Sequence, residues 1–140
     1  MAHAKCYVEG YPRPQFVRGN YELLDGEWDF AFDEEDAGER ERWQRGHDYP
    51  LRIRVPYSYH TPKSGIGRED ACAVVWYERH FSCSRRARER VLLHFDGCDY
   101  TAKVWINGMF LGMHEGAYTR FTFDITALLR RENRLSVRCE

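Results

Sequence analysis

The sequence has 140 residues and a formal net charge of −1 at pH 7, with 21 Lys plus Arg against 22 Asp plus Glu. So balanced a chain has no overall field to attract nucleic acid or an anionic membrane. Its length suits one domain, and its 15% of aromatic residues suit pleated strands. We therefore expect a single domain that binds neither nucleic acid nor membrane.

The chain has an odd number of cysteines, so at least one must be unpaired. Its first residues lack the apolar stretch of a signal peptide, and no cysteine pair or Cys/His cluster has zinc-site spacing. We expect unpaired thiols, a reducing cytoplasmic location, and no metal or cofactor. The five cysteines are Cys6, Cys72, Cys83, Cys98 and Cys139.

The first half predicts an arm, two strands and a long loop. Residues 1–20 read as an extended N-terminal arm, with the domain over residues 21–140. Alternating Trp28, Phe30 and Phe32 predict a half-buried strand over residues 27–32. The charged stretch 33–45 fits either a short helix or a solvated loop. A short strand over residues 51–55 leads into a Gly- and Pro-containing loop, 57–70, and long loops of this kind are often functional.

The second half predicts short strands joined by turns. Residues 73–82 and 91–95 are strand-like, and the basic segment 84–90 between them reads as a solvated turn. Asn107-Gly108 favours a tight hairpin between strands at 101–106 and 109–113, because both residues tolerate positive φ. The chain continues with alternation over 119–123, one possible helical turn over 124–129, and a last strand over 135–139.

The count of eight or nine short strands without a long helix excludes the α/β enzyme folds. Evenly spaced strands and turn signals predict an all-β fold, an antiparallel β-sandwich of jelly-roll type.

Several segments in order carry a resemblance to a known family. Leu24-Asp25-Gly26-Glu27-Trp28-Asp29-Phe30, after Pro12-Arg13-Pro14-Gln15, resembles the opening of family 2 glycoside hydrolases, with Asp25 replacing the usual Asn. The densest match is similar to the β-galactosidase and β-glucuronidase sugar-binding domain. It comprises Ala102-Lys103-Val104-Trp105-Ile106-Asn107-Gly108, Leu111-Gly112-Met113-His114-Glu115-Gly116 and Phe123-Asp124-Ile125-Thr126.

The resemblance implies a larger parent enzyme. In that family a second sandwich domain and a catalytic (β/α)8 barrel follow the first domain. Two glutamates of the barrel cleave the glycosidic bond with retention of configuration. We therefore expect no catalytic residue in this chain, and we expect it to stop before the domain's last strands, which would leave a sheet edge uncovered.

Candidate sugar contacts lie on loops. The resemblance places the loop at residues 64–67 near the mouth of the neighbouring barrel, so that Arg68, Glu69 and Asp70 would contact a terminal sugar. A mobile surface loop is an equally good reading of the same residues.

Three further polar residues have both a functional and a structural reading. Asp99 follows a Gly-Cys turn and could cap it or bind a sugar hydroxyl. His114 and Glu115 precede a glycine on a return loop, where His114 could bind ligand or serve packing. For Trp105 we expect two-sided burial rather than an exposed sugar platform.

The sequence thus predicts a domain that helps shape an exo-β-glycosidase pocket without performing chemistry. Its partners would be carbohydrate, the barrel and the second sandwich domain. A free-standing carbohydrate-binding module is the alternative, and a domain that holds a homo-oligomer together is a third reading. The residues that select a galactoside, glucuronide or mannoside would lie mostly in the barrel.

Overall fold

The computed structural model describes residues 20–84 and 88–140 of the chain. Most of the predicted arm, its proline motif and Cys6 lie outside these ranges. None of the helices within them is long and apolar enough to cross a membrane. The elements are β1 Gly26–Phe32, η2 Trp43–Arg45, β2 Leu51–Val55, η3 Pro62–Ser64, β3 Val75–Ser82, β4 Leu92–Phe95, β5 Thr101–Ile106, β6 Met109–Glu115, β7 Phe121–Asp124 and β8 Glu132–Cys139.

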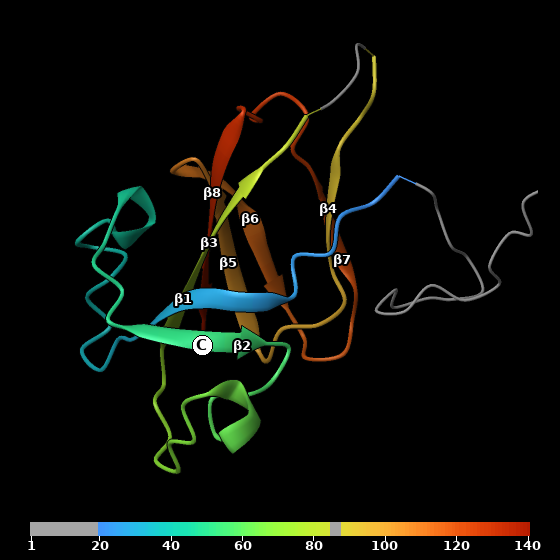
Figure 1. Cartoon of the computed structure of the whole chain (residues 1–140). Helices are drawn as coiled ribbons and strands as arrows, with labels where there is room; N and C mark the ends of the chain where they lie inside the picture. The colour runs from blue at the N-terminus through green and yellow to red at the C-terminus, as the bar shows by residue number, and fades with distance from the viewer. Residues whose placement is uncertain (1–19, 85–87) are drawn as a thin grey trace, which may run out of the picture.

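The strands form two antiparallel sheets (Figure 1). The larger has six strands in the order β2-β1-β3-β8-β5-β6, and the smaller pairs β4 with β7. At the centre, β3 and β8 pair along their whole length, from Val75 opposite Cys139 to Ser82 opposite Glu132. The predicted antiparallel β-sandwich is confirmed.

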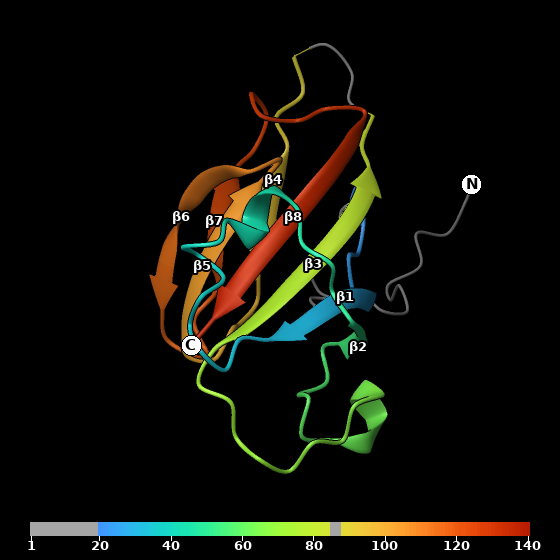
Figure 2. The same ribbon diagram turned by 90° about the vertical axis from the view of Figure 1, so that its left-hand side faces the viewer.

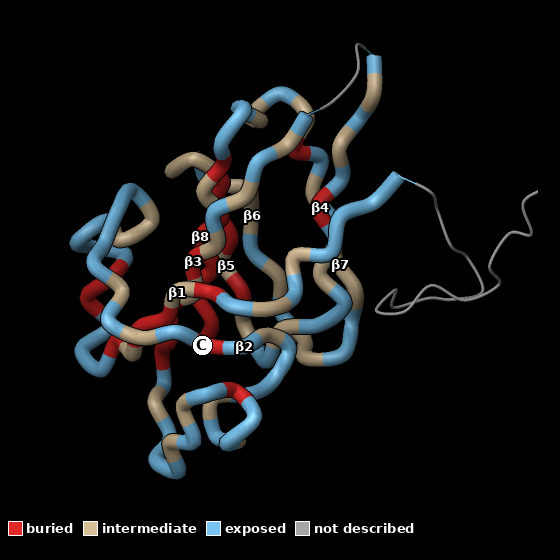
Figure 3. Tube along the Cα trace, in the orientation of Figure 1, coloured by how far each residue is buried: buried red, intermediate tan, exposed pale blue. Residues whose placement is uncertain are grey.

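The main core lies between the two sheets, and alternation along each strand explains its composition. Trp28 and Phe30 of β1 point into it, as do Leu135 and Val137 of β8 and Leu93 of β4. Figure 3 shows buried residues concentrated on β3, β5 and β8, the central strands of the larger sheet. Because successive side chains along a strand point to opposite faces, the intervening residues of these strands point towards the other face of the sheet.

That opposite face, here called the outer face, is also covered. Trp76 of β3 and Trp105 of β5 stack there with ring centroids 5.3 Å apart, and both are buried. Trp43 of η2 packs on Trp76 at 5.9 Å, and Figure 2 shows η2 lying over β5 and β8. The predicted two-sided burial of Trp105 is confirmed, because Val104 and Ile106 point into the main core.

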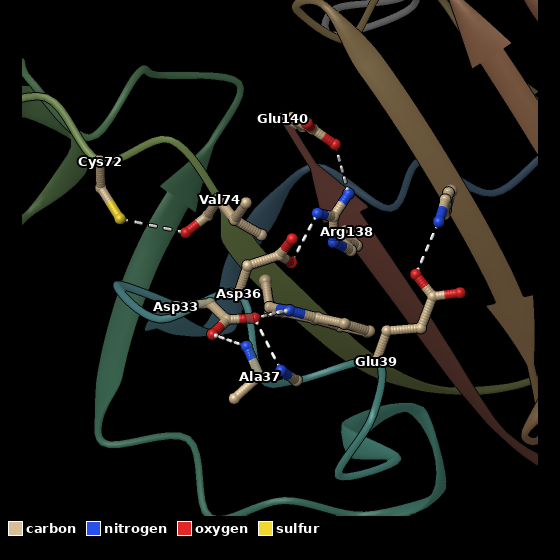
Figure 4. Close-up of polar contacts among 11 residues, drawn as sticks. Asp33, Asp36, Ala37, Glu39, Cys72, Val74, Arg138 and Glu140 are labelled. Atoms are coloured by element: carbon tan, nitrogen blue, oxygen red, sulfur yellow. Dashed lines mark hydrogen bonds and ion pairs between the residues drawn. The ribbon is translucent and has the colours of Figure 1, made fainter.

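The cover over the outer face is residues 33–49, here called the cover segment. Its attachment begins with the buried carboxylate of Asp33, which accepts hydrogen bonds from the backbone N–H groups of Ala37 and Gly38, both at 2.8 Å (Figure 4). The same carboxylate accepts a bond from the indole Nε1 of Trp76 at 3.0 Å. The segment that fitted either a helix or a loop is therefore a folded turn ending in η2.

Two ion pairs fasten the cover segment farther along. The guanidinium of Arg138, on β8 and buried, donates to Asp36 at 2.7 Å and to Glu140 at 2.8 Å. Lys103 of β5 donates to Glu39 at 2.6 Å. The ion pairs of Arg138 compensate the buried positive charge of its guanidinium, which would strongly destabilise the fold if it were unpaired.

Asn107 and Gly108 form the predicted tight turn between β5 and β6. Their φ angles are 52° and 80°, and Ile106 pairs with Met109 across the turn. The Asn107 side chain does more than tolerate the turn. Its Nδ2 donates to the Leu128 carbonyl at 2.9 Å, and its Oδ1 accepts from the backbone N–H of Arg134 at 3.0 Å.

The first prediction concerns this turn. Gly108→Val should lower the free energy of unfolding by about 1 kcal/mol or more, because a β-branched residue resists positive φ. Gly108→Asn is the matched control and should lose less, since Asn tolerates this region. Chemical denaturation measures both; an unchanged midpoint for Gly108→Val would contradict the turn's role.

The second prediction concerns Asp33. Asp33→Ala leaves three donors without an acceptor and should cost about 3 kcal/mol or more, since hydrogen bonds to a charged group are each worth about 1.5–3 kcal/mol. Glu35→Ala, an exposed change in the same turn, should stay within about 0.5 kcal/mol. Equal unfolding midpoints for the two variants would show that Asp33 does not hold the cover segment.

Candidate functional site

The candidate sugar contacts fall in two separate regions of the domain. The first loop joins β2 to β3 and carries Arg68, Glu69 and Asp70. It is held by contacts of its own: the buried Ser64 Oγ donates to the Thr61 carbonyl at 2.7 Å, and the Tyr59 hydroxyl accepts from the backbone N–H of Cys72 at 3.0 Å. These contacts fix the loop's path from η3 to β3.

Arg68 is engaged within the domain. Its guanidinium lies over the Phe32 ring, 4.3 Å from the centroid, and donates to Glu34 at 2.6 Å. The hydrogen bond from Arg68 lowers the pKa of the Glu34 carboxyl. Glu69 and Asp70 are exposed. Of these three residues, only the two acids are exposed, and Arg68 is half-buried.

The second site is built from two loops in contact, residues 96–100 and 116–120, here called the paired loops. The backbone N–H of Gly116 donates to the Tyr100 carbonyl at 2.9 Å, and Arg120 forms an ion pair with Asp96. A Cβ at Gly97 would stand 2.6 Å from the Ala117 carbonyl oxygen, so the loops touch through backbone. Both loops lie at the lower end of the sandwich in Figure 1.

The first of the paired loops brings Asp99 to the end of the sheet where β6 ends in Glu115. Glu115 ends β6 opposite Thr101, two residues after Asp99 in the chain. Both carboxylates are exposed. From the sequence, these two residues were separate candidates. The pairing of β5 with β6 places them at the same end of the sheet.

His114 has a packing role in this structure. Its ring stacks on Phe121 of β7 with centroids 4.3 Å apart and an interplanar angle of 17°. Its Nε2 is buried without a hydrogen-bond partner among the residues that the structure describes. His114 therefore supports the Glu115 end of β6 rather than presenting a free ring.

Sequence reasoning missed two aromatic residues of the paired loops. Tyr118 is 97% exposed and Tyr100 is 58% exposed. Exposed aromatic rings and carboxylates commonly bind sugars. The C–H groups of the sugar pack on the ring, and its hydroxyls donate to the carboxylate oxygens. The only signal in the sequence was a tyrosine in a turn. Turns lack the alternating pattern from which the exposure of a strand residue can be predicted.

Asp25, the residue that departs from the family's Asn, lies close to the same end. Partial burial raises the pKa of its carboxyl, and the neighbouring Asp96 carboxylate raises it further. Asp96 itself is bound by Arg120. This is a carboxyl with a raised pKa next to a carboxylate already held by an arginine.

Two polar pockets lie elsewhere, on either side of His80, with volumes of about 210 and 300 Å³. Several of their charged groups are paired within the domain. His80 Nε2 lies 3.1 Å from Glu78, and Arg52 pairs with Asp29. Among the described residues, no group of three or more His, Cys, Asp or Glu side chains is placed to hold a metal ion.

Comparison with known proteins decides the family. The family model described as "Glycosyl hydrolase 2 galactose-binding domain-like" matches residues 69–140, just over half of the chain. This chain belongs to that family. The match runs from Glu69 through β8 and so contains both paired loops and the whole β5–β6 hairpin.

Relatives of this glycosyl hydrolase 2 domain are similar over most of the chain. A β-galactosidase of Thermoanaerobacter pseudethanolicus is 39% identical over 83 residues, 58% of this chain and 11% of that protein. A β-glucuronidase of Paenibacillus borealis is 33% identical over 121 residues, 81% of this chain and 20% of that protein. The chain thus spans a fifth or less of these two relatives.

A solved structure agrees with the sandwich. A β-glucuronidase from Ruminococcus gnavus, in complex with a C6-substituted uronic isofagomine, matches with a TM-score of 0.78 and 28% identity. The match covers 96% of this chain and 23% of that chain.

The third prediction tests the contact between the paired loops. Gly97→Ala should separate them, because the added Cβ meets a backbone oxygen that cannot move aside, and should cost about 1–3 kcal/mol of stability. Hydrogen exchange at the Gly116 amide should accelerate in Gly97→Ala and stay unchanged in Glu115→Ala, an exposed control. An equally slow Gly116 amide in both variants would contradict the contact.

Proposed function

We propose that this chain is the non-catalytic sugar-binding domain of an exo-β-glycosidase, and that it helps shape the pocket around a terminal β-glucuronide or β-galactoside. The observation that supports this best is the paired loops. In a domain of this family they present Asp99 and the exposed Tyr118 at the end of the sandwich where β6 ends in Glu115.

Charge and geometry support a role without chemistry. Retaining hydrolysis needs an acid/base and a nucleophile held about 5–5.5 Å apart, with the acid's pKa raised. Asp99 and Glu115 are exposed on the rim of the domain, and Asp96 is held by Arg120. The chain spans about 20% of such a relative, and the catalytic carboxyls would come from a barrel domain in the remainder.

The same geometry sets the strength of sugar binding. A hydroxyl that bonds to an exposed carboxylate exchanges water for protein and gains only about 0.5–1.5 kcal/mol. One exposed ring and two rim carboxylates must also offset the lost freedom of the sugar. The isolated domain should therefore bind a monosaccharide weakly and depend on a second wall for tight binding.

A free-standing carbohydrate-binding module is the alternative, and the 97% exposure of Tyr118 favours it. Such a module would bind sugar with this aromatic platform alone. Affinity separates the two functions, because a complete site binds far more tightly than half a pocket.

The fourth prediction is that the isolated domain does not hydrolyse aryl β-glucuronides or aryl β-galactosides. The reason is that, by this proposal, the acid/base and the nucleophile both lie in the barrel and not in this domain. A fluorogenic assay at high protein concentration measures this, with heat-denatured protein as the blank. Turnover above the blank that persists through repurification would overturn the proposal.

The fifth prediction concerns affinity. Glucuronate or galactose should bind with a dissociation constant of about 1 mM or weaker, which corresponds to about −4 kcal/mol or less favourable. Tyr118→Ala and Asp99→Ala should weaken binding further in a ligand-observed NMR titration. Met109→Ala, an exposed change at the opposite end of the β5–β6 hairpin, is the matched control. Micromolar binding abolished by Tyr118→Ala would instead support the free-standing module.

A further inference from the structure

Two cysteine thiols are in direct contact at the end of the sandwich. Cys98 Sγ lies 2.7 Å from Cys139 Sγ, although 41 positions separate the two residues in the chain. Cys139 ends β8 and is fixed on both sides, because it pairs with Val75 of β3 and with Ala102 of β5. Cys98 sits in the first of the paired loops and packs against the core.

The two thiols differ in environment. Cys139 is buried, whereas Cys98 is half-buried and precedes the exposed Asp99. A hydrogen bond from the Cys139 thiol lowers the pKa of Cys98, against the opposing effect of burial. The same bond, together with burial, raises the pKa of Cys139. Cys98 is therefore the thiol that ionises first, and the thiolate is the nucleophile in disulfide exchange.

We propose that Cys98 and Cys139 form a reversible disulfide by exchange with a low-molecular-weight disulfide such as oxidised glutathione. The Cys98 thiolate attacks one glutathione sulfur, and the S–S bond breaks to release one reduced glutathione, which takes up a proton. The Cys139 thiolate then attacks the Cys98 sulfur and releases the second glutathione. Two protein thiols lose two electrons, and the glutathione disulfide accepts them.

The bond would fasten the loop that carries Asp99 and Tyr100 to the end of β8. The chain between the two cysteines contains β5, β6 and β7, so the cross-link closes a long loop and constrains the unfolded chain strongly. Cys72 offers a contrast within the same domain. Its thiol donates to the Val74 carbonyl at 3.1 Å and faces no other described cysteine at bonding distance.

The test is to incubate the reduced protein with oxidised glutathione, quench with an alkylating agent under denaturing conditions, and map the peptides. The titre of five thiols should fall by two, with a single cross-linked peptide that joins Cys98 to Cys139. The melting temperature should rise by several degrees and return to its original value with dithiothreitol. An unchanged titre, or a cross-link between other cysteines, would overturn the proposal.

Three variants separate the two steps. Cys139→Ala should trap glutathione on Cys98 as a stable adduct, because the resolving thiol is absent. Cys98→Ala should leave Cys139 unmodified, since that thiol is buried. Cys72→Ala is the control and should still form the disulfide. If Cys139→Ala does not fold, Cys98→Ala decides: glutathione found on Cys139 in that variant would contradict the assigned order of attack.

Discussion

The buried carboxylate of Asp33 is the interaction on which the arrangement of the domain depends. It stands at the end of β1 and holds both the turn of the cover segment and the indole of Trp76. Its own backbone N–H donates to the Val74 carbonyl at 2.9 Å, just before β3 begins. One residue therefore fixes the start of β3 and holds the cover segment on the outer face, so the central strands are buried on both sides.

This two-sided burial is what makes the end of the sheet a rigid support. β8 lies between β3 and β5, and its last residues set the position of the paired loops. Backbone groups of Tyr100 and Thr101 both donate to the Glu140 carbonyl, at 3.1 and 2.9 Å. Carboxylates and an exposed tyrosine on such a support need little ordering when a sugar arrives, so the proposed role in lining a pocket suits the fold.

The sequence was sufficient for features that depend on neighbours in the chain. Alternation located β1 and the two-sided burial of Trp105, and Asn107-Gly108 located the hairpin, because each pattern is local. The sequence was insufficient for features that depend on contacts between residues far apart in the chain. The charged stretch after β1 has no periodicity, since its structure comes from Asp33 meeting Trp76, 43 positions away. The pairing of Arg68 with Glu34, 34 positions apart, was equally invisible.

A residue-resolved NMR titration of the isolated domain with glucuronate and with galactose tests the central claim most directly. The account predicts small chemical-shift changes, still rising at millimolar sugar, at residues 96–100 and 114–120, with weaker changes at residues 64–70. Changes centred on the two polar pockets beside His80 would contradict it, and so would a spectrum unchanged at every sugar concentration.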